Sequence, residues 1–263
     1  TKTLDYLGVR LHRLTQNELI SEVRASVVQK RQLTFSYYGF HTANIITSNR
    51  AAKELFDSLG ILMPDGIAIL YTTWLFGVPM ATKNRGNGDI IAPYLFPEAV
   101  RQGWKIYLLG GAPGIASEAA EILQLAFSGL QIVGTHHGYL SSEAMNQAVV
   151  NDINQSGATI VIVGMGQPLQ EQWIVSRKAR VHAPVLLAVG GFFDHLCRRV
   201  DCYPAWVYRS KLNWAYRLFT EPGRLWKRYT LGALRFGMHL CWAICMRFFS
   251  RLARKFTKQS ERL

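Results

Sequence analysis

The chain has 263 residues, of which 49% are hydrophobic and 12% aromatic. A chain of this composition can bury a sizeable core, which excludes an intrinsically disordered protein. Its formal net charge is +13, but residues 209–263 hold 13 Lys and Arg against two Glu, whereas residues 1–208 hold 17 basic and 15 acidic residues. The body is therefore nearly neutral and the tail strongly basic, which predicts a polyanionic partner for the tail.

The first elements lead to a single acidic residue. The N-terminal residues show no apolar run typical of a secretory signal, so we expect a cytoplasmic protein. Ser48 to Leu59 has a helical pattern, and the apolar run from Ile61 to Pro64 predicts a strand that delivers Asp65 and Gly66. A carboxylate at a strand end can act as a general base on a hydroxyl group, although Asp-Gly is also common in simple turns.

Three later apolar runs each end in glycine. Residues 105–109 lead into Gly110 and Gly111, residues 159–163 into Gly164 and Gly166, and residues 185–189 into a further glycine pair. Helical patterns lie between them, over residues 115–127 and 142–155, the second with a serine as expected N-cap. This alternation predicts an α/β fold with a Rossmann-like parallel sheet and flanking helices.

The glycines have two interpretations. At the carboxyl ends of parallel strands they let backbone N–H groups approach a phosphate, but they also serve in ordinary tight turns. None of the three runs contains G-x-G-x-x-G, so a nicotinamide-dependent enzyme is disfavoured. The histidines and the four cysteines show no metal-ligand spacing, so we expect no metal site, no cofactor and reduced thiols.

The tail after residue 200 has a different texture, with aromatic residues interleaved with Arg and Lys. Leu231 to Phe249 is too apolar to lie in water and too short and interrupted to span a bilayer, which needs about 20 residues. We therefore predict two domains: residues 1–200 as a catalytic domain that binds a nucleotide-sugar, and residues 201–263 as a basic amphipathic helical appendage that binds the membrane surface.

Short motifs over almost the whole length resemble the WecG/TagA/CpsF family of bacterial glycosyltransferases. They occur in one order at compatible spacing: His41-Thr42-Ala43-Asn44, Met63-Pro64-Asp65-Gly66, Leu108-Leu109-Gly110-Gly111-Ala112-Pro113, Val133-Gly134-Thr135-His136-His137-Gly138-Tyr139, Gly164-Met165-Gly166-Gln167-Pro168-Leu169-Gln170-Glu171, Gly190-Gly191-Phe192-Phe193-Asp194 and Trp214-Ala215-Tyr216-Arg217-Leu218-Phe219-Thr220-Glu221-Pro222-Gly223-Arg224.

The resemblance implies an inverting, metal-independent transfer of a hexose from a UDP-sugar to a sugar on polyprenyl diphosphate, in the synthesis of a bacterial surface polysaccharide or exopolysaccharide. It makes Asp65 the general base. It implies donor binding by Thr42, Asn44, Arg85, Gly110, Gly111, Gly164, Gly166, Gln167, Gln170 and Glu171. It implies binding of the acceptor diphosphate by Arg217, Arg224, Lys227 and Arg228. The expected location is peripheral, on the cytoplasmic face of the bacterial inner membrane, and a homo-oligomer is an open expectation.

The chain departs from the family pattern near the donor site. Gly39 stands where many relatives have Asn, Cys202-Tyr203-Pro204 stands for Arg-Ala-Pro, and the element around Arg85 is one residue short. These changes favour a neutral hexose such as glucose over an N-acetylmannosamine-type sugar, and both are kept as donors.

Two other classes of protein compete with this prediction. A nucleic-acid-binding protein accounts for the basic aromatic tail but not for the apolar stretch or the near-neutral body. A non-catalytic membrane scaffold accounts for the tail but gives Asp65 no function. We therefore expect no nucleic acid among the partners.

Overall fold

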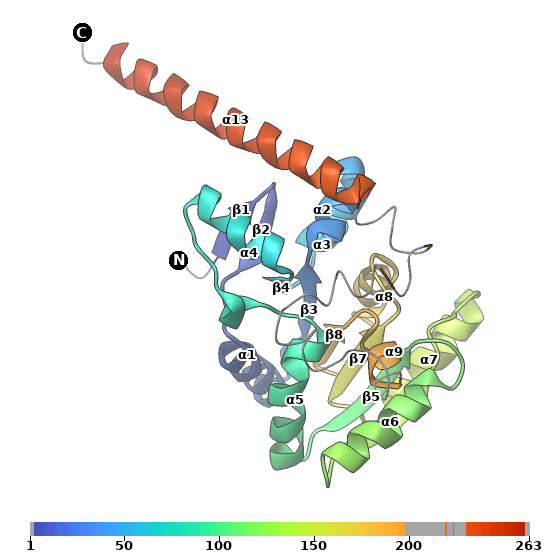
Figure 1. The fold of residues 1–263 in the computed structure, drawn as a ribbon. Coiled ribbons are helices and arrows are strands. Elements are labelled where there is room, and N and C mark those ends of the chain that lie inside the picture. Colours follow the sequence, from blue (N-terminus) through green and yellow to red (C-terminus); the bar gives the residue numbers. More distant parts are fainter. Residues whose placement is uncertain (1–2, 198–218, 220–222, 224–229, 261–263) are drawn as a thin grey trace.

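The fold is built on one six-stranded parallel sheet. The computed structural model describes residues 3–197, 219, 223 and 230–260, and for residues 247–260 the backbone alone. The strands lie in the order β4-β3-β8-β7-β5-β6 and pair in parallel throughout (Figure 1). Their bounds are Leu33–Tyr38 (β3), Ile61–Pro64 (β4), Lys105–Gly110 (β5), Gln131–His136 (β6), Ile160–Gly164 (β7) and Val185–Ala188 (β8). The predicted α/β fold with a parallel sheet is confirmed.

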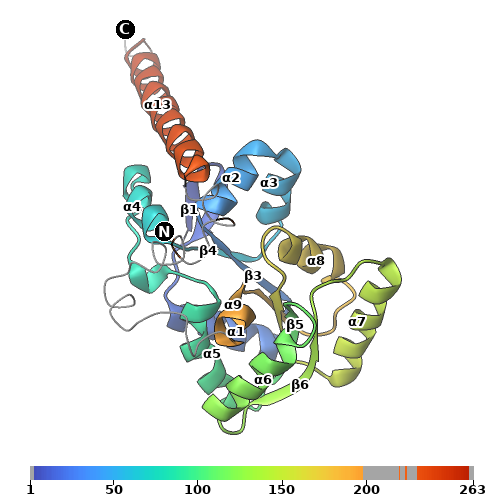
Figure 2. The same cartoon turned by 45° about the vertical axis from the view of Figure 1, so that its right-hand side comes forward.

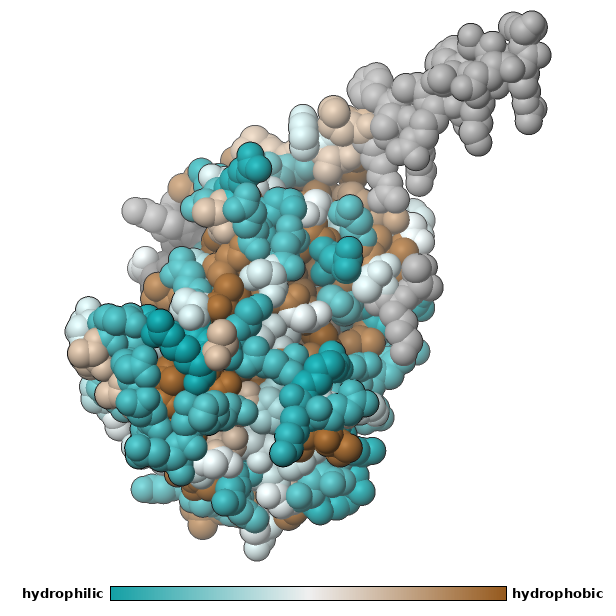
Figure 3. Space-filling model, turned by 180° about the vertical axis from the view of Figure 1, so that it is seen from behind, coloured by the Kyte–Doolittle hydropathy of each residue, from teal (hydrophilic) through white to brown (hydrophobic). Residues whose placement is uncertain are grey.

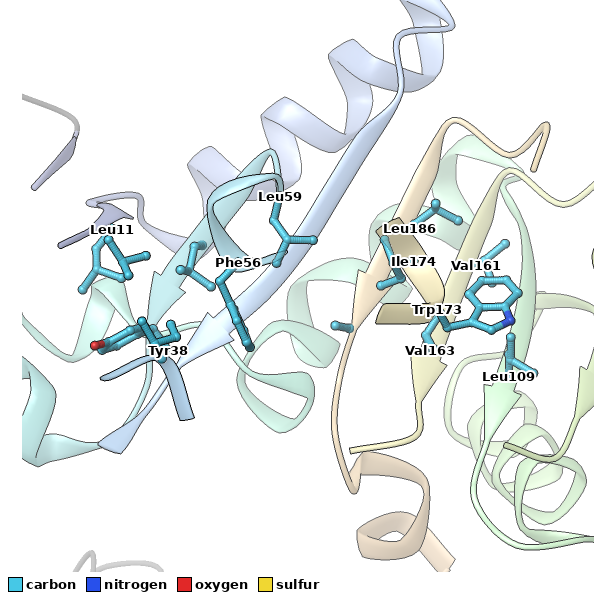
Figure 4. Packing of buried hydrophobic residues seen from close by; sticks show 14 of the residues in the cluster. Leu11, Tyr38, Phe56, Leu59, Leu109, Val161, Val163, Trp173, Ile174 and Leu186 are labelled. Carbon is cyan, nitrogen blue, oxygen red and sulfur yellow. The ribbon is translucent and has the colours of Figure 1, made fainter. Parts of the chain in front are cut away.

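Helices cover both faces of the sheet, because the central strands are apolar on both sides. On β5, Ile106 and Leu108 pack into one buried cluster and Tyr107 and Leu109 into another. The first cluster is covered by α1 (Gln16–Gln29), α5 (Gly88–Gln102), α6 (Ile115–Ala126) and α9 (Phe192–Cys197). The second is covered by α2 (Phe40–Ser48), α3 (Arg50–Asp57), α7 (Glu143–Ser156) and α8 (Leu169–Arg177), and Figure 4 shows part of it.

A short antiparallel hairpin precedes the sheet. It consists of β1 (Thr3–Tyr6) and β2 (Val9–His12), joined by Leu7 and Gly8 with positive φ. Tyr6 is fully buried and its ring packs edge-on against Tyr38 at the end of β3. The hairpin therefore closes the cluster beside β4, where α4 (Ile67–Thr73) and the 3-10 helices η1 (Trp74–Phe76) and η2 (Thr82–Asn84) follow.

The chain between β3 and β4 differs from the prediction. The helix expected from Ser48 to Leu59 is shorter, and a second helix precedes it. Asn49 has extended backbone, and its side chain accepts a hydrogen bond from the Ala52 N–H, so it ends α2 and caps α3. By contrast, the predicted cap at Ser142 is confirmed: its hydroxyl accepts from the Met145 N–H at the start of α7.

The C-terminal helix α13 (Leu231–Ser260) leaves the body at one end (Figures 1 and 2). Its base packs on α2, and Phe236 is 7% exposed within the same cluster as the sheet residues. Leu240 and Ala243 also pack against that cluster. No helix in the described part of the chain is both long and apolar enough to cross a membrane. Residues 1–2, 198–218, 220–222, 224–229 and 261–263 lie outside the description.

Candidate active site

The carboxyl ends of the strands carry most of the predicted site residues. β5 continues through α6 to β6 on one side, whereas β7 continues through α8 to β8 on the other. Because the connections that follow these two paired strands leave in opposite directions, a crevice is expected at the carboxyl ends of the strands, and ligands of open parallel sheets bind at such a point. Gly110 ends β5 and Gly164 ends β7, as predicted.

Close backbone approach explains these glycines. Gly110 has φ +153°, and a Cβ atom there would lie 2.3 Å from the Gly164 carbonyl oxygen. The Gly111 N–H donates a hydrogen bond of 3.0 Å to that oxygen. Gly166 differs, because its φ is +77° and a Cβ there would meet nothing within 4 Å. Packing therefore requires Gly110, whereas Gly166 leaves backbone uncovered at the crevice.

Two helices begin at this crevice with no side-chain cap. The N-cap of α6 is Gly114 and that of α8 is Pro168, and neither side chain makes a capping hydrogen bond. The Ile115 N–H at the start of α6 donates to the Ala112 carbonyl oxygen, and the Gln170 N–H at the start of α8 donates to the Gly166 carbonyl oxygen, each at 3.0 Å. The positive end of each helix dipole still favours an anion at these two starts.

Asp65 follows β4 directly and its backbone is fixed by the neighbouring strand. Its N–H donates to the Tyr38 carbonyl oxygen at 2.8 Å. The carboxylate Oδ1 accepts from Arg85 Nη2 at 2.9 Å, from Arg85 Nε at 3.3 Å and from Asn87 Nδ2 at 3.0 Å. The Asp65 and Arg85 side chains are 22% and 26% exposed. Within the described residues no donor reaches Oδ2, so one oxygen is held and the other is available to a substrate hydroxyl.

Arg85 was predicted as a donor-binding residue, and in this structure it pairs with Asp65. Asn87 was not predicted, and it has two roles: its Nδ2 binds Asp65, and its Oδ1 accepts from the Ile90 N–H to cap α5. An Asn three residues before Ile90 is a signal for a helix N-cap that the sequence contains. The contact of Asn87 with the Asp65 carboxylate, 22 positions earlier, cannot be predicted from a local pattern.

Thr42 and Gln167, from distant parts of the chain, meet directly. The Thr42 hydroxyl donates to Gln167 Oε1 at 2.6 Å and accepts from the Gly39 N–H at 3.1 Å. Gln167 Nε2 in turn donates to the Tyr37 carbonyl oxygen at 2.7 Å. The start of α2 and the loop after β7 are thus tied together beside the end of β3, next to Asp65.

Gln170 and Glu171 lie beneath this pair, and both are fully buried. Gln170 Oε1 accepts from the Gly190 N–H at 2.9 Å, and its Nε2 donates to Glu171 Oε1 at 2.7 Å. Ser36 Oγ donates to the same Glu171 oxygen at 2.6 Å. Burial raises the pKa of Glu171, against the opposing effect of these hydrogen bonds. Their predicted contact with the donor stays a prediction.

Asn44 faces away from the Thr42 pair, toward the C-terminal helix. Its Nδ2 donates to the Gly232 carbonyl oxygen at 2.7 Å. It borders an open hollow of about 420 Å³ between α2 and α13, with His41, Ile45, Ser48, Leu231, Gly232 and Arg235. The structure therefore separates two residues that the motif places two positions apart. The four predicted diphosphate ligands, Arg217, Arg224, Lys227 and Arg228, lie outside the described residues.

The sequence was compared with known proteins. The model of the family described as "Glycosyl transferase WecG/TagA/CpsF family" matches residues 4–249. The chain belongs to this family. A curated WecG/TagA/CpsF-type relative from Bacillus spizizenii, named "N-acetylglucosaminyldiphosphoundecaprenol N-acetyl-beta-D-mannosaminyltransferase", is 28% identical over 180 residues, which are 68% of each chain. The family resemblance predicted from the motifs is confirmed, and membership supports glycosyl transfer as the activity.

Proposed function

We propose that this glycosyltransferase moves a hexose, with inversion, from a UDP-sugar to a sugar carried on polyprenyl diphosphate. The observation that carries the proposal is Asp65, which stands at the end of β4 with Oδ1 held by Arg85 and Asn87 and Oδ2 available. Family membership supports glycosyl transfer. The name of the Bacillus relative supports a polyprenyl-diphosphate acceptor and an N-acetylmannosamine-type donor; the small residue at Gly39 keeps glucose as the second candidate.

The reaction needs a base and a way to hold charge on the leaving group. The acceptor hydroxyl attacks the anomeric carbon and passes its proton to Asp65 Oδ2, a new C–O bond forms, and the bond to the UDP oxygen breaks with its electron pair on UDP. The uncapped starts of α6 and α8 supply N–H groups for this developing charge. A positioned base of this kind contributes about 100- to 10,000-fold to the rate.

The proposed donor site lies next to a cluster of hydrogen-bonded polar side chains beside Asp65. Thr42 and Gln167 stand beside Asp65, and Gln170 and Glu171 hold the backbone and side chains below them. In this assignment the donor site is formed by Thr42, Gln167, Gln170, Glu171 and the glycines, with Thr42, Gln170 and Glu171 fully buried in this structure. Arg85 orients the base and is released to substrate only if the Asp65 pair opens.

The appendage supplies the acceptor side. Residues 201–263 form the membrane-binding part in this proposal, and residues 1–200 the catalytic part. Arg217, Arg224, Lys227 and Arg228 bind the acceptor diphosphate, because a guanidinium fork fits phosphate oxygens. Helix α13 lies in the headgroup layer on the cytoplasmic face of the bacterial inner membrane: Leu234 and Met238 are 63% and 59% exposed, and residues 231–260 hold six basic and no acidic residues.

The direct test is a product assay. Purified protein is incubated with vesicles that contain a lipid-diphosphate-linked N-acetylglucosamine and, in separate reactions, with UDP-N-acetylmannosamine, UDP-glucose or UDP-N-acetylmannosaminuronate. Mass spectrometry of the lipid fraction should show the acceptor plus one hexose unit with one of these donors. An unchanged acceptor with all three, in a protein that binds UDP, would refute the proposed reaction. A parallel reaction with EDTA tests the expected independence of a divalent metal.

A further inference from the structure

A second exposed apolar patch lies directly after Asp65. Tyr71 is 76% exposed, Trp74 69% and Leu75 43%. The opposite side of the same short segment is buried, with Ile69, Leu70 and Phe76 in the core. The inward residues account for the folding of α4 and η1, whereas the outward three expose large apolar surface without a folding role. We call Tyr71, Trp74 and Leu75 the α4 patch.

The α4 patch stands at the same end of the molecule as α13. Figures 1 and 2 both show α4 and the base of α13 projecting at that end, above the sheet. There α13 is apolar on two opposite faces: Phe236, Leu240 and Ala243 pack on the body, while Leu234 and Met238 are exposed. Figure 3 shows apolar side chains at the base of α13 where it leaves the body. A helix that only packed on the body would need one apolar face.

We propose that the α4 patch is a second membrane contact, which enters the headgroup layer of an anionic bilayer together with α13. Tyr and Trp suit this layer because each has an apolar ring and a polar tip. The charges nearby also fit an anionic bilayer, because residues 66–84 contain Lys83 and no acidic residue and residues 231–260 contain only basic charges. Two-point contact fixes the orientation of the body, which one helix alone does not.

The position of the patch gives this contact a function. Trp74 lies nine residues after Asp65, most of them in α4. Asp65 is thus joined to the patch by Gly66 and one short helix. In this proposal a patch resting in the headgroup layer keeps Asp65 near the membrane surface. A sugar on a membrane diphosphate stands at that level, so the inference rests on the proposed acceptor.

The test uses the full chain with Tyr71→Glu and Trp74→Glu combined. Leu125→Glu is the matched control, because Leu125 is 87% exposed on α6 and lies outside the α4 patch. Co-sedimentation with phosphatidylglycerol-containing vesicles should show binding weakened roughly tenfold or more by the double variant and unchanged by the control. Transfer to a vesicle-embedded acceptor should fall with it, whereas transfer to a short-chain, water-soluble acceptor should stay at the wild-type rate.

The experiment separates failure of the α4 patch inference from failure of the proposed function. Vesicle binding equal to the control would overturn the inference, and a change in sedimentation state with unchanged vesicle binding would assign the α4 patch to a protein interface instead. If the wild type transfers no sugar to either acceptor, the proposed function fails, yet vesicle binding still tests the patch. Should the double variant misfold, Trp74→Phe replaces it: fluorescence quenching by brominated lipid should drop relative to wild type, and unchanged quenching would contradict the contact.

Discussion

The body and the C-terminal helix differ in how far their apolar side chains are buried. In the body, each central strand is covered on both faces and the charges nearly balance. In α13, one face packs on α2 and the opposite face carries exposed Leu234 and Met238. Within the described residues, the body buries most of its apolar side chains on itself, whereas α13 leaves apolar side chains exposed. In the proposed function, the chemistry lies in the body and α13 takes part in attachment to the membrane.

The strongest test of this division is Asp65→Ala. We expect transfer to fall about 100- to 10,000-fold, because the variant loses the proposed base, while vesicle binding and UDP binding stay at wild-type levels. Single-turnover transfer, co-sedimentation and calorimetric titration with UDP measure the three properties. Asp57→Ala is the control, since Asp57 pairs only with Lys53 on the surface of α3. Near-normal transfer by Asp65→Ala would remove Asp65 from the mechanism.

Substitutions on the outer face of α13 should have the opposite effect, weakening vesicle binding while UDP binding is retained. Leu234→Glu combined with Met238→Glu should weaken binding to anionic vesicles by a factor of about 100 or more, because two apolar contacts of about 1.5–3 kcal/mol each are lost. UDP binding should not change. Val28→Glu, at a 77% exposed position on α1, is the control. If vesicle binding survives in the double variant, the basic residues alone hold the protein at the membrane and the exposed stripe needs another explanation.

The sequence predicted the parts of this arrangement that local patterns determine. Apolar runs followed by glycine correctly predicted the carboxyl ends of β5, β7 and β8, and Pro64-Asp65-Gly66 correctly predicted the end of β4. The order of the strands follows from contacts between residues far apart in the chain, which no local period contains. The predicted helix from Ser48 to Leu59 ran across the break at Asn49, and the helix before it, α2, was not predicted.

The site was harder to predict for the same reason. Thr42 and Gln167 are 125 positions apart, and their hydrogen bond depends on a strand order in which β8 lies between β3 and β7. Gln170 and Glu171 are polar residues that the pattern places at a substrate surface, yet the fold buries them completely. The family motif identified these residues, but the sequence does not show that Thr42 is buried as completely as Gln170 and Glu171, or that Gln167 is the member of this group that is only partly buried.

That buried pair offers a test confined to the body. Burial raises the pKa of Glu171, so the folded state binds its proton more tightly than the unfolded state. The stability gained from this proton is complete below the unfolded pKa and is lost as pH rises through the folded pKa. Glu171→Gln abolishes this titration. We therefore expect the Tm of the variant relative to wild type to rise between pH 4 and pH 8, as measured by thermal unfolding of both proteins across this range.

The control for this pH dependence is Glu54→Gln, because the Glu54 side chain is 66% exposed on α3. Its Tm difference from wild type should stay constant over the same range. A constant difference for Glu171→Gln as well would mean that Glu171 does not titrate with folding. Vesicle binding should be unaffected by either variant, which keeps this effect on the body side of the comparison.

The smallest expected effect concerns the donor and sharpens the role of the body. Gly39 caps α2 with extended backbone at φ −109° and ψ 179°, and a Cβ atom there would lie 3.8 Å from the Asp65 carbonyl oxygen, in ordinary contact. Gly39→Asn therefore fits, and Asn is a favourable N-cap. Its amide can hydrogen-bond the acetamido group of an N-acetylated donor, worth about 1 kcal/mol. We expect the product ratio from competing UDP-N-acetylmannosamine and UDP-glucose to shift roughly fivefold toward the N-acetylated sugar. Gly39→Ala adds the Cβ without the amide and should leave the ratio unchanged; equal ratios in both variants would place the donor's acetamido position away from the start of α2.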